Sequence, residues 1–362
     1  MGATIRLILN LILLISIVYG SYFNEYSDRF ARKLVIAAAG ARADDPMQCL
    51  NQAFPQDFYR LISRDETICD AKQNTCACYT AVSTHTQTII VAFRGTSTQS
   101  QMKTEMSESL KPSIDWYGYG LIDKYFYDAI DKMWPYIQPA LNETSSSHFE
   151  VIFTGYSLGG ALATLAAMKT HAMNLRASAK IKLLTFGEPR VGNSIFATNV
   201  DRVINDGYRV VHKADIVPHL PPCKDAKTDR RACDRGDLRR MYHHGTEVWY
   251  NNDMGENADY HLCTKDDEDP ECSDGLKNTK PRIISTILDG MWEPQQARQR
   301  NCGVDRVVNV TDDLKKISST FQEEMESDEC SVIFVAPPKK AIQFGSSDFG
   351  RLLTIPLIAN GF

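Results

Sequence analysis

Gly155-Tyr156-Ser157-Leu158-Gly159 is the stretch that decides the fold of this chain. An apolar run, 151–154, precedes it, and a run of small residues, 160–168, follows it. A strand, a tight turn and an alanine-rich helix form the context of a nucleophile elbow, a sharp turn that presents a serine hydroxyl. Glycine on either side of the serine removes Cβ atoms that would clash in such a turn. The pattern predicts a reactive serine, and its context disfavours the alternative of an ordinary glycine-rich turn.

Strand-like and helix-like segments alternate along much of the chain. Residues 88–93, 181–186 and 208–212 read as strands, and residues 118–137 have helical periodicity. Strands that alternate with helices predict an α/β fold, with a mostly parallel central sheet flanked by helices on both faces. This alternation does not continue toward the end of the chain, so residues 306–362 are expected to form an extension of different character.

The first twenty residues differ from the rest of the chain. Arg6 is their one charged residue, residues 5–18 are almost entirely apolar, and small residues precede Ser21. A basic start, a short apolar run and a small-residue cleavage point predict a signal peptide over 1–20, and therefore a secreted protein. The apolar run is short for a bilayer span, so no transmembrane segment is expected after cleavage, and an uncleaved anchor is the alternative.

Composition excludes some partners and favours disulfides. The net charge of −5 gives no indication of nucleic acid as a partner. All ten cysteines follow residue 20, and an even number in a secreted chain favours disulfides over metal ligands. No metal and no organic cofactor is expected. The sequons at Asn142 and Asn309 are compatible with a glycoprotein.

Acyl transfer by a serine needs a base beside it and an acid that orients this base. In hydrolases built on a nucleophile elbow, these groups follow the chain order serine, acid, histidine. Asp215 satisfies this order, because it lies just beyond the strand 208–212. Carboxyl ends of parallel strands face the crevice in which ligands bind. Asp215 is therefore the candidate acid, and a loop aspartate that caps a turn is the alternative.

Two backbone N–H donors are also needed to hold the oxyanion. One donor is expected from Leu158, the residue after the candidate nucleophile. The second is expected on the loop after an earlier strand, where Gly95 allows close backbone approach and Thr96 supplies an N–H and a hydroxyl.

With these residues in place, the chain resembles a fungal-type (class 3) lipase of the α/β-hydrolase superfamily, in the secreted form abundant in nematodes. The segments that carry the resemblance are Phe93-Arg94-Gly95-Thr96, Gly155 to Ala161, Thr185 to Gly192, Asp215-Ile216-Val217-Pro218 and His243 to Trp249. The last segment resembles the family's H-P-G-x-E-x-W, with His244 in place of proline. The resemblance implies that Ser157 is the nucleophile, Asp215 the triad acid, and Thr96 with Leu158 the oxyanion pair.

The resemblance also implies features around this site. It places the hydrolase domain at 21–305 and pairs Cys263 with Cys272 in a disulfide. Residues 97–113 correspond to the family's lid, a segment that covers the acyl site until an interface or substrate displaces it.

This chain departs from the family's pattern at the position of the catalytic histidine. Gly290 stands where the resemblance puts this histidine, and no histidine follows His261. His261 is the late candidate for a substitute base, ahead of His243 and His244. Three explanations stay open: a non-catalytic relative that keeps a lipid pocket, an enzyme that recruits another base, and an aberrant transcript or gene model in which residues 290–302 are a local replacement.

The sequence thus predicts a secreted carboxylic-ester hydrolase, similar to triacylglycerol lipases, that acts on lipid or ester substrates through a serine acyl-enzyme. The alternative is a catalytically impaired lipid-binding relative, a pseudo-lipase, because Gly290 replaces the expected histidine. A cysteine-rich extracellular interaction protein would leave the elbow unexplained.

Overall fold

The computed structural model describes residues 26–109, 113–223, 233–263 and 268–276. These residues belong to one compact unit of the chain. The predicted signal peptide (1–20), the extension (306–362), Gly290 and Asn309 lie outside the described residues. None of the described helices is long and apolar enough to cross a membrane.

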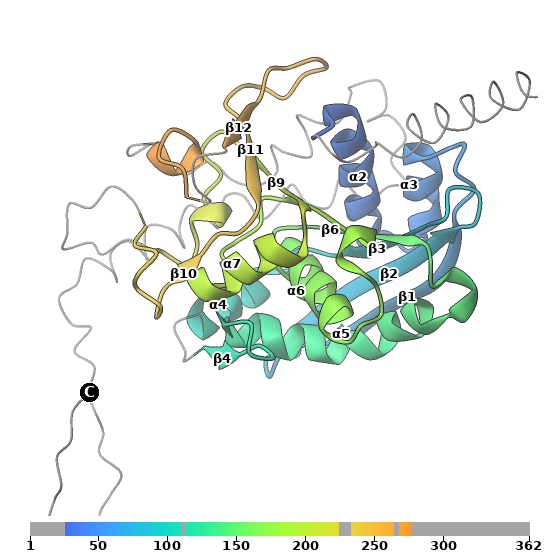
Figure 1. Cartoon of the computed structure of the whole chain (residues 1–362), viewed down its shortest axis with the longest axis horizontal. Helices are drawn as coiled ribbons and strands as arrows, with labels where there is room; N and C mark the ends of the chain where they lie inside the picture. Colours follow the sequence, from blue (N-terminus) through green and yellow to red (C-terminus); the bar gives the residue numbers. More distant parts are fainter. Residues whose placement is uncertain (1–25, 110–112, 224–232, 264–267, 277–362) are drawn as a thin grey trace, which may run out of the picture. The chain divides into compact units, whose positions relative to one another are not determined.

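A central sheet of eight strands forms the framework (Figure 1). Its spatial order is β1-β2-β3-β6-β7-β9-β11-β12. The strands are β1 (Arg60–Ile68), β2 (Thr75–Ser83), β3 (Thr88–Phe93), β6 (Glu150–Tyr156), β7 (Ile181–Phe186), β9 (Asp206–His212), β11 (Thr246–Tyr250) and β12 (His261–Cys263). The five strands from β3 to β11 are parallel, whereas β1, β2 and β12 pair antiparallel at the two edges. The predicted mostly parallel sheet is confirmed.

Helices cover both faces of this sheet. They are α2 (Asp28–Gly40), α3 (Pro46–Ala53), α4 (Gln99–Glu108), α5 (Lys124–Asn142), α6 (Leu158–Ala172) and α7 (Ser194–Val203). Short 3-10 turns are η1 (Thr144–Ser146), η2 (Ser178–Lys180), η3 (Val217–His219) and η4 (Ser273–Gly275). A second, small sheet has the order β10-β8-β5-β4 and consists of β4 (Ile114–Asp115), β5 (Leu121–Ile122), β8 (Gly192–Asn193) and β10 (Met241–Tyr242).

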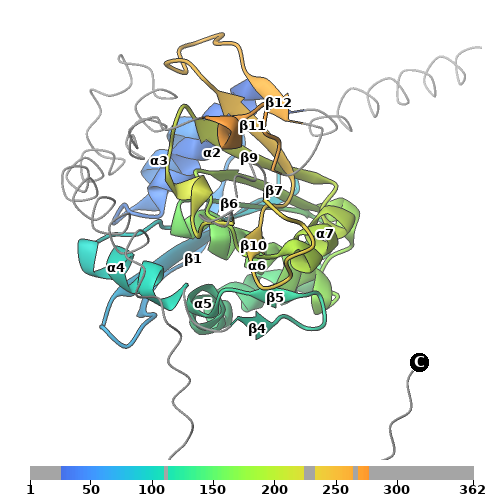
Figure 2. The same ribbon diagram turned by 90° about the vertical axis from the view of Figure 1, so that its left-hand side faces the viewer.

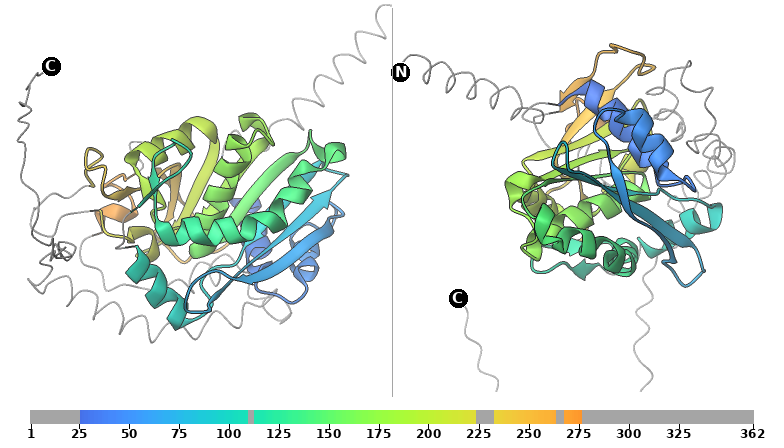
Figure 3. Two further views of the ribbon diagram at one scale, coloured as in Figure 1. Left: turned by 90° about the horizontal axis from the view of Figure 1, so that it is seen from below. Right: turned by 90° about the vertical axis from the view of Figure 1, so that its right-hand side faces the viewer.

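The strands alternate their side chains between two buried clusters. Figure 2 shows the ribbons of α2 and α3 on one side of the sheet and that of α5 on the other. Ile90 and Ala92 of β3 pack with α2 and α3, whereas Val91 and Phe93 pack with α5 and α6 on the opposite face. This alternation follows from the two-residue period of a strand. Figure 3 shows α5 lying across one face of the sheet. A central strand is thus buried on both sides, which explains its continuous apolar sequence.

The helix expected over 118–137 begins later in the structure. Its first residue is Lys124, and the side chain of Asp123 caps the helix by accepting a hydrogen bond from the Tyr125 N–H at 2.7 Å. Gly118 and Gly120 have positive φ values of 77° and 125° and form the turn between β4 and β5. Glycine adopts this backbone region without steric cost, so the sequence before Asp123 favours a turn over a helix.

Candidate active site

Ser157 lies at the turn between β6 and α6, with φ 55° and ψ −126°. A non-glycine residue with positive φ is unfavourable, and such strain persists only where the surrounding structure enforces it. Two hydrogen bonds fix the turn: the Ser157 N–H donates to the carbonyl of Phe186 at 2.9 Å, and the Gly160 N–H donates to the carbonyl of Ser157 at 2.8 Å. The Ser157 backbone is therefore held at the carboxyl ends of β6 and β7.

The glycines around Ser157 are required because three backbone segments meet there. A Cβ atom on Gly155 would lie 2.1 Å from the carbonyl oxygen of Gly159. A Cβ atom on Gly159 would lie 2.3 Å from the carbonyl oxygen of Phe93, and one on Gly95 would lie 2.5 Å from that of Tyr156. The loop after β3 and the start of α6 are thus in direct backbone contact. This contact places the two predicted oxyanion segments side by side.

Leu158 and Thr96 occupy these two segments. Leu158 is the first residue of α6, so its N–H has no carbonyl acceptor within the helix. Thr96 is buried, and Arg42, just after α2, donates to the carbonyls of Gly95 and Thr96 at 3.3 and 2.5 Å. The guanidinium therefore holds the loop after β3 by its backbone, close to the start of α6.

The hydroxyl of Thr96 is held by the helix α4. Its Oγ1 donates to both carboxylate oxygens of Glu105, each at 2.8 Å. Burial raises the pKa of Glu105 to about 8, against the hydrogen bond from Thr96, which lowers it. On the same helix, Met102 and Met106 pack into the cluster that contains Tyr156. The helix in the predicted lid segment therefore contacts the loop of Thr96, and its methionines belong to the same apolar cluster as the last residue of β6.

Asp215 lies just beyond β9, separated from β6 by a single strand, β7. Only 1% of its surface is exposed. Its Oδ1 accepts a hydrogen bond from the Val217 N–H at 3.1 Å, whereas its Oδ2 is buried without a hydrogen-bond partner in the described part of the chain. Burial raises the pKa of Asp215 to about 7. The structure thus brings the predicted nucleophile and acid to the same end of the sheet.

All eight histidines of the chain fall within the described residues, and none donates to Oδ2 of Asp215. Most contact groups elsewhere in the fold. These contacts are His171 with Ser178, His212 with the Asn252 carbonyl, His219 with Asp274, His243 with the Pro218 carbonyl, His244 with Glu188, His85 with Phe58 and His148 with Phe149.

His261 does not join Ser157 and Asp215. It is exposed at the start of β12, the edge strand, and no hydrogen bond links its ring to either residue among those described. Four strand spacings separate β12 from β6, about 19 Å at the usual distance between neighbouring strands. A ring on β12 is too far away to take a proton from Ser157 in this arrangement.

A buried ionisable pair behind the elbow was not predicted from the sequence. Glu188 and His244 are both almost fully buried, and His244 Nε2 lies 3.2 Å from Glu188 Oε1. Thr164 of α6 and Thr185 of β7 each donate to Glu188 at 2.5 Å. Burial alone would raise the pKa of Glu188, but the charge of His244 and these hydrogen bonds lower it. The signal in the sequence was His244 in place of the family's proline.

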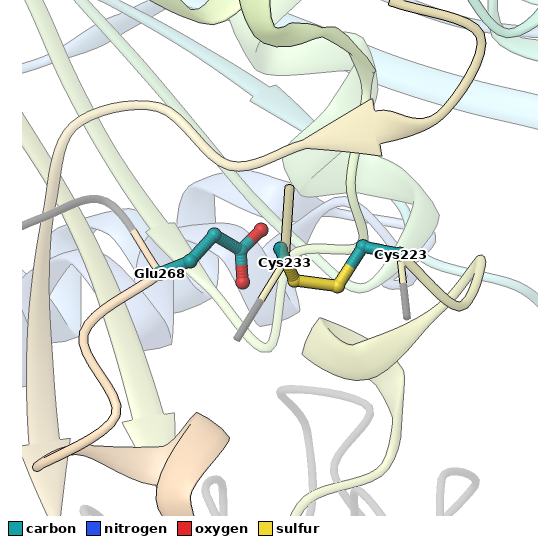
Figure 4. A group of neighbouring side chains, drawn as sticks. All are labelled: Cys223, Cys233 and Glu268. Carbon is teal, nitrogen blue, oxygen red and sulfur yellow. A yellow bond between two sulfur atoms is a disulfide. The ribbon is translucent and has the colours of Figure 1, made fainter. Parts of the chain in front are cut away.

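Two groups of metal-ligating residue types occur in the described residues, and both contain a disulfide. Cys223 and Cys233 are bonded to each other beside Glu268 (Figure 4). Arg190 donates to both oxygens of this glutamate, at 2.7 and 2.8 Å. The second group consists of Glu247 and the disulfide Cys263–Cys272. A disulfide sulfur is not a thiolate, and a carboxylate bound by arginine has its charge compensated, so these groups brace the fold.

A serine on a strained strand-to-helix turn above a mostly parallel sheet defines an α/β-hydrolase. Residues 90–225 match the family described as Lipase (class 3). The chain is 41% identical over 296 residues to lipase ZK262.3 of Caenorhabditis elegans, an alignment that covers 78% of this chain and 83% of that protein. The chain belongs to the class 3 lipase family, as the sequence resemblance predicted. By class it is a lipase-like carboxylic-ester hydrolase.

Fungal proteins are more distant relatives. A lipase of Rhizopus niveus is 31% identical over 195 residues, which is 52% of this chain and 45% of that protein, so less than half of that relative is spanned. The crystal structure of a lipase from Rhizopus microsporus var. chinensis superposes with a TM-score of 0.55 at 26% identity, over 68% of this chain and 80% of that one. These similarities confirm the predicted α/β-hydrolase fold.

Proposed function

We propose that this protein is a secreted hydrolase of lipid carboxylic esters that acts through a serine acyl-enzyme. The observation that carries the proposal is the positive φ of Ser157, in a turn so close-packed that a Cβ atom at position 155, 159 or 95 would clash with neighbouring backbone. Strain of this kind is retained where it serves a function. The names of the relatives, all called lipases, support acylglycerols or related lipids as substrates.

In the proposed reaction, Ser157 Oγ attacks the ester carbonyl carbon, and the N–H groups of Thr96 and Leu158 stabilise the oxyanion that forms. The alcohol leaves, water hydrolyses the acyl-serine, and the carboxylic acid is released. Asp215 orients the base and stabilises its protonated form. Helix α4, whose Glu105 holds the Thr96 hydroxyl, serves as the lid that controls access of lipid to the site at a lipid-water interface.

In this arrangement no histidine of the chain forms a hydrogen bond with Asp215 Oδ2, so none of them is placed to act as the base. Removing one triad member lowers the rate by about 10⁴ to 10⁶ in serine proteases, and the oxyanion hole and substrate binding retain the remainder. We therefore expect slow hydrolysis that still depends on Ser157.

The positions of the histidines also favour a second candidate function, a pseudo-lipase that binds lipid without turnover. In this case lipid binding would be equal in the wild-type chain and in Ser157→Ala, and neither would hydrolyse an ester. The intact elbow, the loop of Thr96 and the buried Asp215 favour the hydrolase.

Secretion is supported by the signal-peptide pattern at 1–20 and by disulfides Cys69–Cys76, Cys223–Cys233 and Cys263–Cys272, which persist in oxidising compartments. Expression of the full chain in a eukaryotic secretory host tests this step. Mature protein that starts near Ser21 in the medium is expected, and retention of the full-length chain in the membrane fraction would contradict it.

The test of activity compares the wild-type chain with Ser157→Ala on p-nitrophenyl butyrate and palmitate. Slow turnover that disappears in the variant is expected. Equal rates in the two proteins, in the presence of bound lipid, would favour the pseudo-lipase.

A further inference from the structure

Among the described residues, the buried oxygen Oδ2 of Asp215 is a hydrogen-bond acceptor without a donor. Its partner oxygen, Oδ1, accepts from the Val217 N–H, whereas Oδ2 has no hydrogen bond in the described part of the chain. A buried polar atom without a partner is costly, and each such atom in a folded protein calls for an explanation. A hydrogen-bond donor from outside the chain would satisfy Oδ2, and adding small molecules to the protein tests this explanation.

Ser157 directly follows β6, and Asp215 lies beyond the end of β9, two places away from β6 in the sheet. Tyr156, Phe186 and Val210 form one row across β6, β7 and β9, and Ser157 and Asp215 both follow this row. Two strand spacings correspond to about 10 Å. An imidazole ring with one hydrogen bond at each nitrogen spans roughly 8 Å from end to end, a length of the same order as this spacing.

We propose that the site binds a free imidazole between Ser157 and Asp215, and that this external ring acts as the general base; the inference rests on the proposed serine mechanism. Imidazole offers the two functions that the positions need. One ring nitrogen donates its N–H to Asp215 Oδ2, and the other accepts a proton from Ser157. All eight histidines of the chain are described, and none of them forms a hydrogen bond with Asp215 Oδ2.

The proton balance closes in each half of the reaction. As Ser157 Oγ bonds to the ester carbonyl carbon, the unprotonated ring nitrogen takes the hydroxyl proton. It returns this proton to the leaving alkoxide when the acyl C–O bond breaks, so alcohol is released and the acyl-enzyme remains. In the second half a water molecule takes the role of the serine, and the proton finally returns to Ser157 Oγ as the carboxylic acid leaves.

The experiment measures p-nitrophenyl butyrate hydrolysis by the full secreted chain at mildly alkaline pH, with increasing imidazole. Ser157→Ala is measured in parallel, because imidazole itself hydrolyses activated esters, and its rate is subtracted. The expected Ser157-dependent rate rises to saturation by on the order of 10²-fold, the lower end of what a positioned general base contributes.

A second probe and two variants identify the position of the ring. 1-Methylimidazole has similar basicity, but in its neutral form it has no N–H to donate to Asp215 Oδ2, so a much smaller rise is expected. Asp215→Asn should abolish the saturable rise. Asp44→Asn, an acid-to-amide change at a side chain that is 99% exposed, should leave it unchanged.

The outcomes separate this inference from the proposed function. Basal turnover that depends on Ser157 but rises with imidazole only as much as in Ser157→Ala would overturn the imidazole site and leave the hydrolase. Equal acceleration by imidazole and 1-methylimidazole would also overturn it. Turnover that never depends on Ser157, with or without imidazole, would overturn the serine mechanism itself.

Discussion

Thr96 Oγ1 donates to both carboxylate oxygens of Glu105 at 2.8 Å, and this contact joins the loop after β3 to helix α4. The same loop lies in backbone contact with the elbow, since a Cβ atom on Gly95 would meet the Tyr156 carbonyl at 2.5 Å. Glu105 therefore fixes the threonine whose N–H is assigned to the oxyanion. Its effect on catalysis passes through Thr96, so Glu105 is a positioning residue.

Replacing Glu105 by alanine is expected to lower kcat for p-nitrophenyl butyrate about tenfold, the equivalent of one lost hydrogen bond. The KM should change less, because the oxyanion forms after substrate binding. Lys103→Ala is the matched control, since Lys103 is exposed on the same helix. Equal kcat values for the two variants would mean that Glu105 does not position Thr96.

Gly155→Ala is expected to destabilise the fold, because the new Cβ atom would lie 2.1 Å from the Gly159 carbonyl oxygen. Overpacking of this kind costs about 2 kcal/mol or more of the unfolding free energy. Gly255→Ala is the control, because a Cβ atom there has no neighbour within 4 Å. Urea unfolding followed by circular dichroism measures both. A loss no larger for Gly155→Ala than for Gly255→Ala would contradict the backbone contact.

Asp215 is expected to make stability depend on pH in a defined direction. Burial raises its pKa from 3.8 to about 7, so the folded state binds more protons than the unfolded state between these values. The contribution of Asp215 to the unfolding free energy therefore falls as pH rises from about 4 to about 7. Asp215→Asn removes this slope, so the variant should gain stability relative to the wild type over that range. A constant difference in unfolding free energy between the wild type and Asp215→Asn at every pH would show that burial does not raise the pKa of Asp215.

His244→Leu is expected to destabilise the protein by about 3 kcal/mol or more, because it leaves Glu188 buried without its histidine partner. The double variant His244→Leu and Glu188→Met should recover part of this loss, since removing both members of a buried pair costs less than removing one. A double-variant cycle by urea unfolding measures the coupling. Additive losses would show that the two residues do not form an energetic pair.

The elbow and the fold were predictable because they depend on local patterns. Gly155, Ser157 and Gly159 lie within five residues, and their steric requirement can be read directly from the sequence. Alternating apolar strands and helices likewise specify the layers. Asp215 could be found because strand ends in a parallel sheet share one edge.

Other features depend on contacts between distant segments. Glu188 and His244 are 56 residues apart along the chain, and their pairing follows from the placement of β7 and of the loop before β11. His261 was a plausible base by chain order, but chain order does not reveal that its strand lies at the edge of the sheet. The start of α5 was misplaced because helical periodicity extends into a turn that glycines 118 and 120 enforce.

The central claim is that Ser157 becomes acylated, and mass spectrometry of the protein after incubation with p-nitrophenyl butyrate tests it most directly. The good leaving group favours acylation, while the lack of a histidine beside Asp215 slows deacylation, so the acyl-enzyme should accumulate. We predict one added butyryl group per chain, on the peptide that contains Ser157, and none in Ser157→Ala. A chain that hydrolyses the ester while this peptide stays unmodified, at a rate unchanged by Ser157→Ala, would contradict the account.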